Sequence, residues 1–279
     1  MVFEKFYTSE FLKNKKYFIF IIALAYSVFG IAGSVLLFRT FTPSTTSLAL
    51  ISLILLVVLK DVLRSSDVST NTNKNTIITI FQEYKNYILL FGYIFAGVML
   101  CFGLFSIILP VESTSQMFES QYSLLGSSHA DQIFSYDVFH VILINNLIVM
   151  LVCIITSFLF GIQTIYLFIV IWNASVVGVI FGVTAKETAL LSGLSPFVIF
   201  LLIIVASLPH IIFEISSFLV AGVTGQHFSN FLFFGRNKRK NYFTVIKLSI
   251  YSIAVSIILL VLGALLESSF APALLKWLF

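Results

Sequence analysis

The sequence predicts an all-α protein, a polytopic bundle of about seven helices that cross a lipid bilayer. Of its 279 residues, 59% are hydrophobic and only 10% are charged, and the mean hydropathy is +1.06. A soluble chain of ordinary composition is roughly 45–50% apolar and about 25% charged. No soluble fold of this length can cover so much apolar surface, so lipid is the expected solvent.

The apolar runs set the expected spans. Crossing a hydrocarbon core about 30 Å thick takes roughly 20 apolar residues in a helix. By this criterion spans are predicted at residues 17–38, 45–63, 87–110, 138–159, 164–183, 195–222 and 243–266. The sixth is long and contains Pro209, which lacks a backbone donor, so we expect that helix to be broken or kinked there.

The distribution of Lys and Arg predicts the orientation. A cytoplasmic N-terminus places 13 of the 16 basic residues on the inner side, as the positive-inside rule requires. The segment 111–137 then forms an external acidic loop, either a contact surface or simply a solvated loop. We expect residues 1–134, with three spans and this loop, to form one region. Residues 135–279 form a second, with four spans and an interfacial C-terminal tail.

Polar residues inside the spans are the candidate functional residues. An ionisable side chain at mid-span costs about 2.5–3.5 kcal/mol on insertion scales, so each one needs a reason. His210 and Glu214 are four residues apart, hence on one helical face, and directly follow Pro209. The expected polar neighbours are Asn145, Asn146 and Asn173. Small residues that permit close helix packing are predicted at Ala174, Gly178, Gly182, Gly222 and Gly225.

These residues leave three interpretations open. The amides, His210 and Glu214 serve as interhelical hydrogen-bond partners, or His210 and Glu214 serve proton-linked transport, or they form a metal or hydrolytic site. In the last case His140 would be the third zinc ligand. No phosphate loop, nucleotide fold or Ser/His/Asp arrangement is visible, so we expect no cofactor, no resident metal and no enzymatic activity. The net charge of +4 is attributed to cytoplasmic loops, not to nucleic-acid binding.

Several of these positions together resemble a known family. The resemblance is to the stage II sporulation protein M (SpoIIM) family, over about residues 135–265. It is carried by Ile144-Asn145-Asn146-Leu147, Gly161, Trp172-Asn173, Gly178, Leu208-Pro209-His210, Glu214, Gly222 and Gly225. The sequence departs from the family pattern at Ile211, where Gly is usual, and after Asn173, where Gly commonly follows.

The resemblance implies a membrane component of a complex. The founding member of the family works with cell-wall hydrolases, and some relatives accompany an ABC ATPase. We therefore expect a non-enzymatic multi-pass subunit or scaffold in the plasma membrane, with membrane proteins as partners and self-association left open. One alternative is the permease subunit of an ABC-type exporter of a peptide or small solute, with the ATPase on the basic loop 236–240. Another is an intramembrane hydrolase that uses His210 and Glu214.

Overall fold

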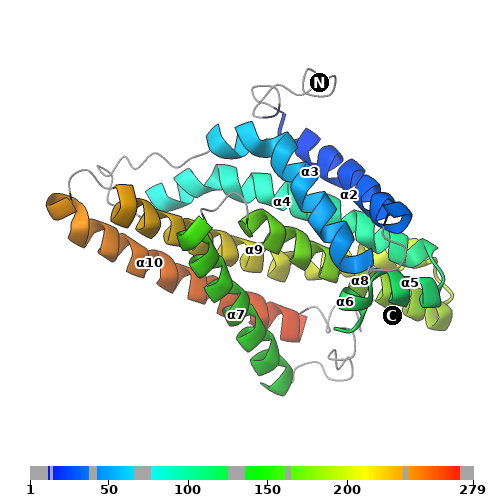
Figure 1. The fold of residues 1–279 in the computed structure, drawn as a ribbon. Coiled ribbons are helices and arrows are strands. Elements are labelled where there is room, and N and C mark those ends of the chain that lie inside the picture. Colours follow the sequence, from blue (N-terminus) through cyan, green and yellow to red (C-terminus); the bar gives the residue numbers. More distant parts are fainter. Residues whose placement is uncertain are drawn as a thin grey trace. The chain divides into compact units, whose positions relative to one another are not determined.

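The computed structural model describes residues 12, 15–37, 43–65, 77–124, 136–160, 165–234 and 238–270, and every regular element in these ranges is helical. In chain order (Figure 1) the elements are α2 (Tyr17–Leu37), α3 (Pro43–Ser65), α4 (Ile77–Ile108), α5 (Val111–Met117), α6 (Glu119–Tyr122), α7 (Tyr136–Phe160), α8 (Ile165–Ser192), α9 (Pro196–Phe234), α10 (Lys238–Leu265) and a closing π-helical turn, η3 (Leu266–Phe270). The predicted all-α class is confirmed.

Six of these helices are long and apolar enough to cross a bilayer: α2, α4, α7, α8, α9 and α10, the last together with η3. The apolar part of α3, Pro43–Leu59, is shorter than the others. Its last turns carry Lys60, Asp61 and Arg64, which limit the apolar run. The chain is thus a helical membrane protein, whereas the seventh span and the cytoplasmic N-terminus stay predictions.

Helix α9 continues through Pro209. Residues 196–234 form one uninterrupted helix, so of the expected break or kink the break is excluded, and the helix extends well past the predicted end at residue 222. α9 packs along both α7 and α10, and such neighbours allow a helix to continue through a proline. A kink without a break stays a prediction.

The junction before α9 follows the usual terminal chemistry. Gly193 has φ of +72°, and its N–H donates to the Ala189 carbonyl at 3.0 Å, which ends α8 in the left-handed conformation that glycine tolerates. Pro196 then occupies the first position of α9, where a missing N–H costs nothing.

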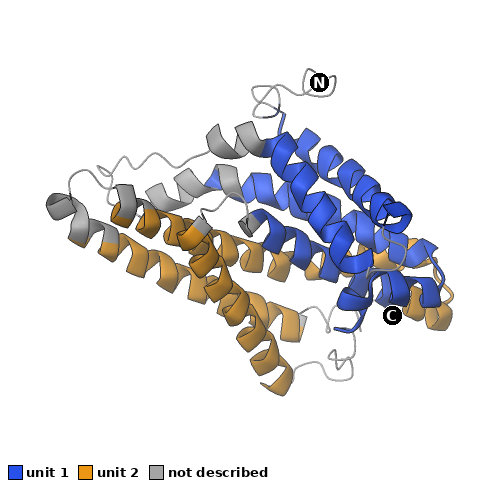
Figure 2. Cartoon of the chain, viewed as in Figure 1, with its two compact units in different colours: residues 1–125, 167–184 blue, residues 126–166, 185–279 orange. Residues whose placement is uncertain are grey.

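The chain divides into two compact units (Figure 2). Unit 1 contains residues 1–125 and 167–184, and unit 2 contains residues 126–166 and 185–279. This division differs from the expected boundary at 134/135, because most of α8 belongs with the N-terminal helices. The expected loop 111–137 contains the short helices α5 and α6, and residues 271–279 of the expected tail lie outside the described residues.

In unit 1, α2 packs against α3 and α4, and glycines allow neighbouring helices to approach α4 closely. A Cβ on Gly97 would lie 2.7 Å from the Phe20 carbonyl oxygen of α2. A side-chain bond also joins α6 to α8, since Gln121 Nε2 donates to Ser175 Oγ at 3.2 Å. Close backbone approach through small residues is how membrane helices gain packing contacts.

In unit 2, α9 is the central helix, packed along α7 and α10. Ser217 of α9 donates its hydroxyl to the Ser256 carbonyl of α10 at 2.7 Å, and both residues are buried. Gly225 of α9 lies against the Ile154 carbonyl of α7, where a Cβ would collide with the backbone. These contacts fix the faces that α9 turns toward each neighbour.

Candidate functional site

Glu214 of α9 is bonded to two other segments of unit 2. The Nδ2 amide of Asn146 on α7 donates to Glu214 Oε1 at 2.7 Å. The Glu214 carboxyl is also hydrogen-bonded to the Glu267 carboxyl on η3. Asn146 is buried, and the two glutamates are partly buried. We refer to Asn146, Glu214 and Glu267 as the polar cluster; it joins α7, α9 and the end of α10.

The two carboxyl groups set a condition on the chemistry of the polar cluster. A carboxylate only accepts hydrogen bonds, so a bond between two carboxyl groups requires a proton on one of them. The pair therefore carries at most one negative charge, and the Asn146 amide donates to Glu214. Sharing one proton lowers the cost of placing two acids inside membrane helices.

Glu267 lies on the π-helical turn η3, directly after α10. π-helical turns are rare and occur frequently at functional sites. Sequence reasoning did not select Glu267, because the seventh apolar run was taken to end at residue 266. An acidic residue immediately after an apolar run is the signal that would have found it. The last span, from which no candidate residue was predicted, thus leads directly into a member of the polar cluster.

Gly263 allows α10 to approach Glu214. It lies one turn before Glu267, and a Cβ there would be 2.9 Å from Glu214 Cγ and 3.5 Å from the His210 carbonyl oxygen. The absence of a side chain at position 263 therefore makes room for the Glu214 side chain as it reaches toward Glu267.

His210 lies one turn before Glu214 on α9 and is 6% exposed. Its Nδ1 atom is buried and has no hydrogen-bond partner among the described residues. Glu214 is thus bonded to α7 and η3, whereas no hydrogen bond joins it to His210 in the described part of the chain. Pro209 precedes His210 within the continuous helix.

The other predicted amides take different positions. Asn145 is exposed on α7, although its neighbour Asn146 is buried. Asn173 is in the part of α8 that belongs to unit 1, and its Nδ2 donates to the Ile169 carbonyl of its own helix at 2.9 Å. Asn173 is therefore not a member of the polar cluster.

The predicted small residues lie at close helix contacts in both units. In unit 1, Gly178 lies against the Met99 carbonyl of α4, and a Cβ on Gly182 would lie 2.5 Å from the Gly103 carbonyl oxygen. Ala174 is fully buried one turn earlier. In unit 2, Gly222 is buried, one turn before Gly225 on α9.

The proposed zinc ligands are not assembled. Within the described ranges, no three or more His, Cys, Asp or Glu side chains form a group that could share a metal ion. His140 is exposed near the beginning of α7, where its ring stacks on Tyr136 with centroids 6.3 Å apart. What the geometry supports is interhelical bonding and the holding of a proton.

Comparison with known proteins gives one match. The family model described as stage II sporulation protein M matches residues 48–272, a wider range than the motif residues at 144–225. No curated protein and no solved structure matches the chain. The family model covers most of the sequence, and the chain belongs to the stage II sporulation protein M (SpoIIM) family.

Proposed function

We propose that this chain is a non-enzymatic subunit of a plasma-membrane complex, which holds or recruits other membrane or membrane-associated proteins. The observation that carries the proposal is that polar groups within the spans bond to other helical segments. Glu214 is bonded to Asn146 and Glu267, and Ser217 is bonded to Ser256. These bonds tie helices to one another, as expected of a subunit whose role is to present surfaces.

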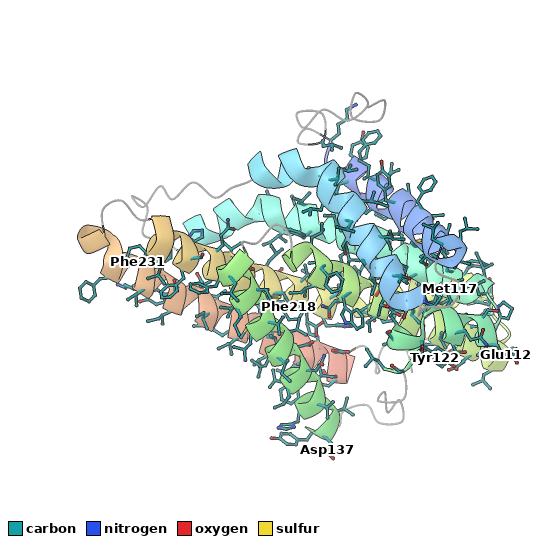
Figure 3. The ribbon with its side chains drawn as sticks, in the orientation of Figure 1. Glu112, Met117, Tyr122, Asp137, Phe218 and Phe231 are labelled. Atoms are coloured by element: carbon teal, nitrogen blue, oxygen red, sulfur yellow. The ribbon has the colours of Figure 1, made fainter. Side chains whose placement is uncertain are left out.

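The acidic segment after α4 is our candidate for a partner surface. Glu112 on α5 (Figure 3) and Glu119 on α6 are both exposed. The short helices that carry them are fixed within unit 1 by the Gln121–Ser175 bond. A rigid, exposed acidic surface suits a partner with complementary basic groups.

The test is affinity purification of the full chain from its native membranes after chemical cross-linking. We expect defined partner proteins to copurify, and the double substitution Glu112→Lys and Glu119→Lys to reduce their recovery. Gln116→Lys adds a positive charge on the same segment without removing an acid, and it should leave recovery close to wild type. Purification without any partner, in both detergent and nanodiscs, would contradict the proposal.

A permease subunit of an exporter is the second candidate, favoured by one observation. The Glu214–Glu267 carboxyl pair holds a proton inside the spans, close in sequence to the buried His210 with its unpartnered Nδ1. Under this proposal an ATPase docks on the basic segment 236–240, and Glu214→Gln abolishes export while membrane abundance is unchanged. Under the subunit proposal the same variant leaves partner recovery intact, and His210→Ala mainly lowers the amount of protein.

A further inference from the structure

The outer face of α7 carries an exposed seam with alternating spacing. Positions four and three residues apart follow one another along the helix, and each of them is exposed: Val141, Asn145, Ile148, Val152, Ile155 and Leu159. This is the spacing of the contact positions in a heptad repeat, with Asn145 at one position and β-branched residues at most of the others. We call these six residues the α7 seam.

Apolar residues on this face also suit contact with lipid, so their spacing alone does not indicate a protein partner. The polar side chain of Asn145 does. Its side chain makes no hydrogen bond with any described residue, although it lies within the apolar window Tyr136–Leu159. At a rise of about 1.5 Å per residue it is roughly 14 Å into the span, close to the middle of a core about 30 Å thick. Asn173 bonds to a carbonyl of its own helix, whereas Asn145 makes no such bond, so a polar group in another helix would satisfy its free donor and acceptor at that depth.

A second copy of the chain provides such a partner at the same depth in the membrane. All copies enter the membrane in one orientation, so α7 of a second copy runs parallel and places its Asn145 at the same depth. A carboxamide is both donor and acceptor, so two of them bond across a two-fold axis. In parallel two-stranded coils a single Asn at a contact position sets the register, and Asn145 is the one polar residue of the α7 seam.

We propose that the chain forms a parallel dimer through the α7 seam, with the two Asn145 amides bonded across the two-fold axis. The Asn146 amide lies about 100° further around α7, on its buried side, and stays bonded to Glu214 within each copy. Adjacent asparagines thus serve two different contacts. Dimer formation is separate from partner recruitment, since a monomer can still copurify with other proteins and a dimer can form without them.

Cysteine cross-linking in membranes tests the geometry. In a chain with Cys101→Ala and Cys153→Ala, Ile148→Cys lies on the α7 seam, whereas Ile258→Cys lies on α10 and is the matched control; the native side chains are 56% and 59% exposed. We expect oxidation to yield several-fold more disulfide dimer at position 148 than at position 258. Equal yields at the two positions, or no dimer at position 148, would overturn the proposal.

Substitution of Asn145 tests the amide bond. Measured by energy transfer between labelled chains in liposomes, Asn145→Leu should raise the dimer dissociation constant about tenfold, as expected for one interhelical hydrogen bond. Asn145→Gln retains the amide and should keep the dissociation constant near wild type. A chain that stays monomeric in lipid at every density, or an Asn145→Leu variant that dimerises like wild type, refutes the inference. Asn145 is exposed within one copy, so thermal unfolding of both variants should match wild type when it is measured at densities where the chain is monomeric.

Discussion

The contact between Gly263 and Glu214 predicts how a single added methyl group disturbs the polar cluster. In Gly263→Ala the new Cβ would lie 2.9 Å from Glu214 Cγ, whereas ordinary contacts begin at 3.4 Å. The two groups must therefore separate by about half an ångström. Overpacking of this kind costs about 1–3 kcal/mol, and alanine recovers up to about 1 kcal/mol in helix propensity. With about 2 kcal/mol for overpacking and about 1 kcal/mol recovered, we expect a net destabilisation of about 1 kcal/mol.

The size of this loss depends on the hydrogen bonds that Glu214 loses when its side chain moves. Cγ lies in the middle of the side chain, so moving it displaces the carboxyl that bonds to Asn146 and Glu267. Glu214→Ala removes Cγ, and in that background Gly263→Ala has nothing to displace on Glu214. The two substitutions should therefore be non-additive, with Gly263→Ala costing about 1 kcal/mol less in the double variant than alone.

The measurement is reversible unfolding of the purified chain in mixed micelles, with the free energy of unfolding as readout. Gly92→Ala is the matched control, because a Cβ there meets nothing within 4 Å. It should be neutral or slightly stabilising. If Gly263→Ala were neutral, or if its cost were unchanged in the Glu214→Ala background, the assigned packing of α10 against Glu214 would be wrong.

Three further predictions use the same unfolding assay. Glu267→Gln keeps a donor for Glu214 and should lie near wild type, whereas Glu267→Leu should lose about 1–2 kcal/mol; equal losses in the two variants would contradict a carboxyl-to-carboxyl bond. Ser217→Ala removes the bond to the Ser256 carbonyl and should cost about 1 kcal/mol; a neutral result would show that α9 and α10 do not need it. Gly178→Ala places a Cβ against the α4 backbone, which cannot rotate away, and should cost about 1–3 kcal/mol; a variant as stable as Gly92→Ala would refute that close approach.

The membrane-helical class could be predicted because composition and run length decide it. A chain with 59% hydrophobic residues and runs of about 20 apolar residues has no other stable arrangement in water or lipid. The family match covers more of the chain than the motif residues do, since it begins at residue 48 and so includes most of α3 and all of α4. A break or a kink was expected at Pro209, and the helix is not broken there; local sequence does not reveal that α7 and α10 pack along α9.

The polar cluster could be predicted only in part. Glu214 stood out because a charge in a span is costly, and Asn146 because amides bond across helices. Which helices meet is a tertiary property, so nothing in the sequence indicated that Asn173 would bond to its own helix in unit 1. Glu267 lies just past the apolar boundary, and the partner of an in-span acid is not encoded by local hydropathy.

The division of the chain into units bears on how it is made. Unit 1 needs residues 167–184, which leave the ribosome after the beginning of unit 2, including α7. Until then, Gly103 and Ser106 of α4 lack the α8 glycine that packs against them, and Gln121 lacks Ser175. The N-terminal helices are therefore inserted but incompletely packed while α7 is synthesised. A nascent chain arrested before residue 167 should expose these faces of α4 and α6 to insertion factors and proteases, and one arrested well beyond residue 184 should protect them.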